Sequence, residues 1–201
     1  MKKHYYELSK IDDFGNGTRE YFYTDEATIR KLAYELYKRE KKKASAGGSD
    51  GDMHQNEPLF SWCKDKSMGY VIQHCGFTMK NDIQWKKLDL GLNRYKNSLY
   101  VLDDIGHFMV ADHINVFASL KKGFKALREH SAKAVKNVDL AKEDEDGCKL
   151  RNGQVRHVVK NNRITEYLCP YHFWEKTSYE YDEWDISATA FILRVKEVKY
   201  L

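Results

Sequence analysis

The chain has 201 residues, of which 42% are hydrophobic and 13% aromatic, and its net charge is +4. This length buries a core without disulfides or metals, and the aromatic content excludes disorder over the whole chain. No apolar run typical of a signal peptide follows the first lysines, and no stretch approaches the roughly 20 apolar residues of a membrane-spanning helix. We therefore expect a soluble, cytoplasmic protein with reduced cysteines and no membrane association.

The start of the chain predicts a hairpin followed by a helix. Residues 4–11 and 19–24 are rich in aromatic and β-branched residues, and an Asn-Gly pair between them is a strong turn signal. Thr24 or Asp25 is placed to cap a helix. The apolar residues of that helix recur at three- and four-residue steps, as on one buried face. They are Ile29, Leu32, Ala33, Leu36 and Tyr37.

The next region predicts a loop, short strands and a further helix. Residues 44–57 are polar and glycine-rich, which indicates a mobile Gly/Ser/Asp loop. Short strands are expected over 59–63 and 70–77. Asn81 is suited to cap a helix with Trp85 on its apolar side.

A long amphipathic helix is expected from about residue 111 to residue 138. Its apolar seam comprises Phe117, Leu120, Phe124, Leu127, Ser131, Ala134 and Val138. Residues 155–159 and 164–168 then predict a second hairpin across two asparagines, and 185–198 predicts an apolar central strand.

This order of elements predicts an α+β fold. We expect a mostly antiparallel sheet packed by an N-terminal amphipathic helix and a long central helix, with residues 1–201 forming a single domain. Regular βαβ alternation is absent, which argues against a doubly wound sheet. The sequence shows no internal repeat.

The distribution of charge predicts a binding surface for an acidic partner, either nucleic acid or protein. Basic residues dominate the long helix and the second hairpin, where few acids oppose them. The candidate binding residues are Lys121, Lys125, Arg128, Arg151, Arg156, Lys160 and Arg163. We therefore expect a non-enzymatic accessory binding protein, and the oligomeric state stays open.

Two patterns leave an enzyme open as an alternative. In a helical segment Asp103 and His107 share one face, where the carboxylate orients the imidazole as a base or metal ligand. The other interpretation is that Asp103 or Asp104 caps a helix.

Cys169 and His172 have the C-x-x-H spacing of zinc ligands or a nucleophilic pair, but the chain lacks the close cysteine pairs of zinc fingers. The alternative to a metal-dependent or Cys/His hydrolase site is a buried thiol at a strand end. A self-associating structural protein is a third possibility. The glycine-bearing stretches form no phosphate loop. We predict no metal and no cofactor.

Overall fold

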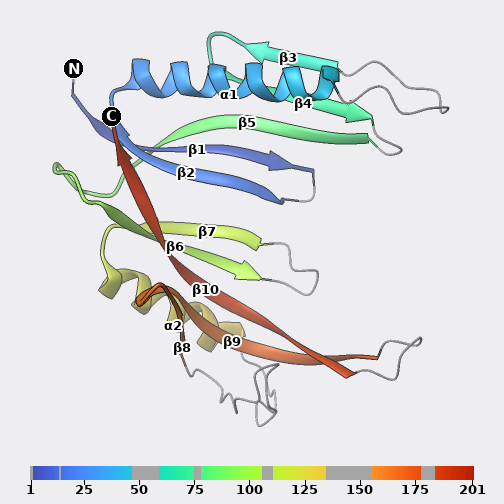
Figure 1. Cartoon of the computed structure of the whole chain (residues 1–201). Helices are drawn as coiled ribbons and strands as arrows, with labels where there is room; N and C mark the ends of the chain where they lie inside the picture. The colour runs from blue at the N-terminus through green and yellow to red at the C-terminus, as the bar shows by residue number, and fades with distance from the viewer. Residues whose placement is uncertain are drawn as a thin grey trace. The chain divides into compact units, whose positions relative to one another are not determined.

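A computed structural model of the chain describes residues 2–13, 15–46, 59–74, 78–105, 111–134, 155–177 and 184–201. These residues form ten strands and two helices (Figure 1). The chain divides into two compact units, which we call unit 1 (residues 1–97 and 197–201) and unit 2 (residues 98–196).

Unit 1 contains two strands, a helix and three further strands. They are β1 (His4–Asp12), β2 (Gly17–Thr24), α1 (Glu26–Ala46), β3 (Leu59–Cys63), β4 (Met68–His74) and β5 (Thr78–Leu88). The strands are antiparallel neighbours in the order β3-β4-β5-β1-β2. The end of β10 (Trp184–Tyr200) adds a parallel pairing to β2, so the sheet is mixed.

The core of unit 1 lies between α1 and one face of the sheet. Tyr6, Leu8 and Phe22 point to this face and pack with Ile29 and Ala33 of the helix. Successive side chains of a strand alternate between faces. The residues of β1 on either side of Tyr6 and Leu8 in the sequence therefore lie on the opposite face of the sheet.

The N-terminal hairpin and α1 agree with the sequence prediction. Gly17 has a φ of 153°, a conformation that favours glycine, at the start of β2. The carboxylate of Asp25 accepts the backbone N–H of Thr28 at 3.1 Å, which is the N-cap contact. Helix α1 ends at Ala46, within the predicted 44–57 loop, and most of that loop lies outside the described residues.

Unit 2 repeats the same order of elements. They are β6 (Ser98–Ile105), β7 (Ala111–Phe117), α2 (Leu120–Ala134), β8 (Arg156–Lys160), β9 (Arg163–Thr177) and the main part of β10. The strand order is β8-β9-β10-β6-β7, in which each strand takes the place of its counterpart in unit 1. The two units therefore share one ββαβββ topology.

The core of unit 2 lies between α2 and one face of its sheet. Leu102, Leu127 and Leu193 are fully buried there, with Phe191 and Tyr167 beside them. A Cβ added at position 123 would lie 2.9 Å from the methyl carbons of Leu193. The glycine that interrupts the apolar seam of the helix therefore permits close packing of α2 on β10.

The predicted α+β class is wrong, because the described chain is mostly sheet. The long central helix expected over 111–138 is also wrong, since its first part is strand β7 and α2 spans only Leu120–Ala134. The segment 111–117 pairs with β6, and its apolar residues Ile114, Val116 and Phe117 suit a strand. The helix starts only where the carbonyl of Ser119 accepts the N–H of Gly123.

The helix expected after Asn81 is likewise a strand, β5. Its backbone pairs with β1 and β4, and Ile83 and Trp85 point to the face covered by α1. The spacing of these residues fits the period of a helix and the period of a strand. The hydrogen bonds to β1 and β4 make the segment a strand. Within the described residues no helix is long and apolar enough to cross a membrane.

Candidate functional site

Three of the predicted basic residues lie on one exposed stripe of α2. Lys121, Lys125 and Arg128 are spaced by four and three residues, while Leu127 on the other side of the helix is buried. The nearest acid on the stripe is Glu129, whose carboxylate lies 3.7 Å from Lys125 Nζ. An exposed pair of this kind contributes little, so the stripe keeps its positive character.

An open cleft of about 800 Å³ runs along this stripe. Leu120 and Phe124 supply its apolar part, and the three basic side chains and Glu129 form the rest of its lining. The ring of Phe124 packs edge-to-face against Tyr167, with 4.7 Å between centroids. Its half-buried ring is thus held in place beside the cationic side chains.

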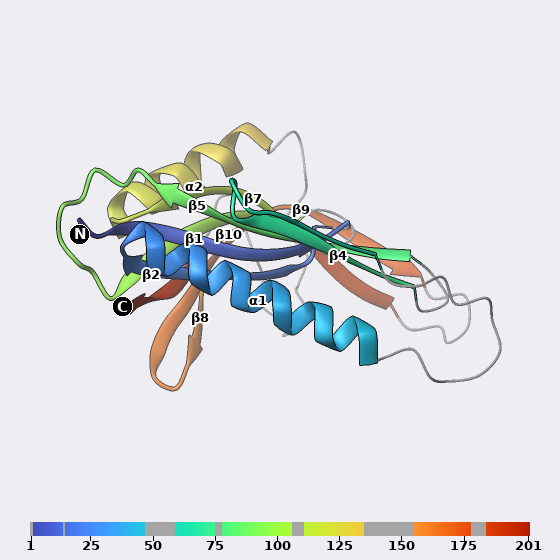
Figure 2. The ribbon, with the colours of Figure 1, turned by 90° about the horizontal axis from the view of Figure 1, so that it is seen from above.

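The predicted hairpin is present as β8 and β9. Asn161 and Asn162 have φ values of 51° and 57°, as a tight hairpin turn requires. Lys160 pairs directly with Arg163 across the turn, and both are exposed. The turn extends away from α2 (Figure 2), so the two basic groups form separate surfaces of unit 2.

The side chains of the other two predicted residues, Arg151 and Arg156, lie outside the described part of the structure. The backbone of Arg156 lies in β8, whereas no part of Arg151 is described. The structure therefore groups three of the seven residues on α2 and two at the hairpin turn.

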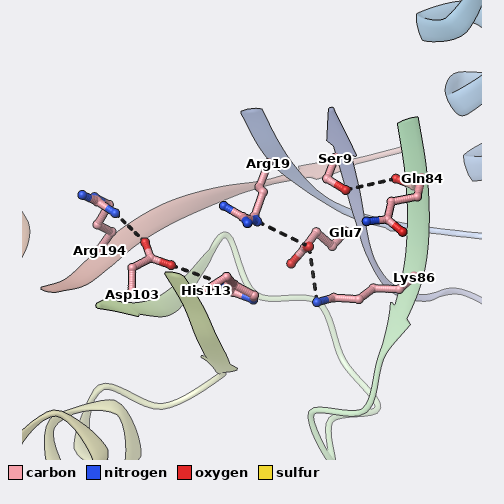
Figure 3. A network of polar contacts seen from close by, with 8 residues as sticks. All are labelled: Glu7, Ser9, Arg19, Gln84, Lys86, Asp103, His113 and Arg194. Carbon is pink, nitrogen blue, oxygen red and sulfur yellow. Dashed lines mark hydrogen bonds and ion pairs between the residues drawn. The ribbon is translucent and has the colours of Figure 1, made fainter. Parts of the chain in front are cut away.

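Asp103 belongs to a strand rather than to a helix, so its predicted roles as a helix cap or as the helical partner of His107 are wrong. It lies on β6, is 4% exposed, and accepts hydrogen bonds from His113 Nδ1 at 3.1 Å and from Arg194 (Figure 3). Arg194 also donates to Glu166 at 3.2 Å. His107 lies outside the described residues.

The pKa of Asp103 is lower than its ordinary value. Burial raises the pKa of this carboxyl, but the hydrogen bond from His113 and the charge of Arg194 outweigh that effect. The group is therefore a carboxylate held by two donors. An imidazole oriented by a carboxylate is suited to general-base chemistry, but the cleft along α2 is lined by neither Asp103 nor His113.

Unit 1 carries a matching polar cluster on the counterpart strands. Glu7 on β1 is 4% exposed and lies 3.3 Å from Lys86 on β5 and 3.9 Å from Arg19 on β2 (Figure 3). In unit 2 the acid Asp103 lies on β6, and the bases His113 and Arg194 lie on β7 and β10. These three strands are the counterparts of β1, β2 and β5 in unit 1. Each unit thus neutralises one buried acid from both neighbouring strands.

Cys169 is a fully buried thiol that donates to the hydroxyl of Ser131 at 3.2 Å. Burial raises the pKa of this thiol, so it stays protonated, the wrong form for a nucleophile or a zinc ligand. The side chain of His172 lies outside the described part of β9.

Among the described residues no group of three or more His, Cys, Asp and Glu side chains is placed to hold a metal ion. Comparison of the chain with protein-family models, with curated proteins and with solved structures finds no match.

Proposed function

We propose that the protein is a non-enzymatic accessory binding protein that docks an acidic polypeptide against α2. The observation that carries this proposal is the cleft along the helix. Its apolar floor is formed by Leu120 and Phe124. Its edge carries three cations and one acid, which are Lys121, Lys125, Arg128 and Glu129.

This combination fits an amphipathic acidic segment. Apolar side chains of such a segment enter the floor, and its carboxylates meet the lysines and the arginine at the edge. Three cations on one stripe supply few of the phosphate contacts on which nucleic-acid affinity depends. The apolar floor therefore favours a polypeptide over nucleic acid.

The hairpin turn supports the same kind of partner at a second surface. Val159 and Ile164 face each other across the strands and are 58% and 38% exposed, next to the basic pair Lys160 and Arg163. An exposed apolar pair beside a basic pair repeats the chemistry of the α2 cleft.

The test uses a fluorescent synthetic helix of Glu residues with Leu at every third or fourth position, and its Lys-for-Glu counterpart. Fluorescence anisotropy at low salt is expected to detect binding of the acidic peptide only. Replacing both Lys121 and Lys125 by Glu is expected to weaken this binding about tenfold or more, because two attractive contacts become repulsive.

The matched control reverses two exposed lysines of α1, Lys31 and Lys42, which gives the same change in net charge. The control variant is expected to bind the peptide like the unmodified protein. Equal weakening in both variants would show a nonspecific charge effect and contradict the proposal. Binding of a single-stranded oligonucleotide without binding of the peptide would also contradict it.

A further inference from the structure

A second open cleft, of about 430 Å³, lies in unit 1 at the first turn of α1. The helix begins at Glu26, and the cleft is lined in part by the ends of β1 and β5. Tyr6 and Lys87 are direct partners across these strands, so their side chains share one sheet face. His4, two residues before Tyr6, lies on the same face.

The two acids of this cleft are already engaged by groups of the protein. Both carboxylate oxygens of Asp25 accept hydrogen bonds from Thr28, one from its N–H and one from its hydroxyl, each at 3.1 Å. Glu26 accepts two hydrogen bonds from Arg30, at 2.7 and 3.0 Å. These carboxylates are therefore committed to the cap and to the arginine.

Apart from Arg30, which is paired with Glu26, the basic groups of the cleft are not engaged in this way. Within the described part of the chain Lys2, His4 and Lys87 make no salt bridge. Partial burial and the charges of Lys87 and Lys2 lower the pKa of His4, as expected where positive charge is concentrated. The cleft thus has positive charge available for an anion.

Tyr6 supplies a phenol donor at the cleft, and no hydrogen bond found among the described residues uses this hydroxyl. Tyr6 is 2% exposed and lines the cleft, while its ring packs against Trp85 with 5.6 Å between centroids. Burial, Glu26 and Asp25 raise the pKa of this phenol, so it keeps its proton and can donate it in a hydrogen bond.

We infer that this cleft binds a terminal phosphate group, with Lys2 and Lys87 supplying charge and the Tyr6 hydroxyl donating a hydrogen bond. The first turn of α1 adds the positive end of a helix dipole. The volume is that of a small-molecule site. This site goes beyond the proposed docking function, since it lies in unit 1 and involves no residue of α2.

The experiment is a titration of the full chain with inorganic phosphate and with a pentose phosphate at constant ionic strength, followed by NMR of the backbone amides. Saturable shifts are expected at Ala27 and Thr28 in the first turn of α1. Lys87→Gln is expected to weaken binding about tenfold, and Tyr6→Phe about fivefold, because each removes one contact to the anion.

Lys31→Gln is the control, since it removes the same charge from an exposed position of α1 outside the cleft. Tyr6→Phe deletes a hydroxyl that no hydrogen bond among the described residues uses, so the fold is expected to persist. Oligonucleotides with and without a terminal phosphate distinguish a nucleic-acid end from a free ester as the source. Shifts that do not saturate, or equal weakening by Lys31→Gln and Lys87→Gln, would overturn the inference.

Discussion

The carboxylate of Asp103 on β6 lies 3.1 Å from Nδ1 of His113 on β7, and Arg194 on β10 donates to its other oxygen. Replacing Asp103 by Asn removes the charge that holds both bases. We expect the free energy of unfolding to fall by up to about 3 kcal/mol, because the Arg194 guanidinium then keeps only the more exposed Glu166 as a charged partner. Urea denaturation at neutral pH measures this loss. An unchanged midpoint would mean that the cluster contributes no net stability.

The same carboxylate gives stability a dependence on acidic pH. Its folded pKa lies below the ordinary value of 3.8, so the unfolded state binds the proton more tightly. The stabilisation is therefore complete above pH 3.8 and disappears as the pH falls through the folded pKa. The difference between the unmodified protein and Asp103→Asn is expected to shrink when urea denaturation is repeated in acid. A difference that grows as the pH falls would exclude this origin.

Gly17 occupies a position that no other residue fits. A Cβ there would lie 1.9 Å from the carbonyl oxygen of Lys10, in addition to the unfavourable φ. Gly17→Ala is expected to destabilise the protein by at least about 3 kcal/mol. Gly91→Ala is the control, because φ is 62° but no atom lies within 4 Å, and it is expected to cost only about 1 kcal/mol. Thermal unfolding of the two variants compares these costs.

The two cysteines with described side chains are expected to differ in reactivity. Cys63 is exposed, whereas Cys169 is buried against Ser131 and burial raises its thiol pKa. Alkylation of the native protein, read by peptide mass spectrometry, is expected to label Cys63 quickly and Cys169 only after opening of unit 2. Labelling of both at equal rates would place Cys169 in a more accessible setting than the structure describes.

The pKa of His4 is expected to lie below its ordinary value of 6.5, since partial burial and the charges of Lys87 and Lys2 disfavour its protonation. Lys87→Gln removes one of these charges, so it is expected to raise the His4 pKa. A titration of the imidazole protons by NMR measures the change, with Lys31→Gln as the control. A lower pKa in Lys87→Gln would contradict the positive character of the cleft.

The repeated topology could not be recognised from the residues. In unit 1 the helix-facing pair on the first strand is Tyr6 and Leu8, and in unit 2 it is Tyr100 and Leu102. A shared topology requires only that side chains alternate between two faces and that turns lie in the same order. Because many sequences meet that requirement, two units with one fold need not show an internal repeat.

The candidate sites were only partly visible in the sequence. The spacing of Lys121, Lys125 and Arg128 is a local property of a helix, so the basic stripe could be predicted. The partnership of Asp103 with His113 depends on strand register, and proximity along the chain instead favoured His107. The cleft at Tyr6 depends on where α1 begins and on which strand lies beside β1, neither of which local spacing encodes.

By itself, the sequence determined the elements that rest on contacts between near neighbours. The Asn-Gly hairpin, helix α1 with Ile29 on its buried face, and the hairpin around Asn161 follow from turn chemistry and helical period. Only the tertiary structure decided that 78–88 and 111–117 are strands. Their apolar spacing suits a helix or a strand, and the strand forms because its backbone is hydrogen-bonded to other strands of the sheet. The division into two similar units was decided there for the same reason, since β-sheet pairing is a long-range interaction.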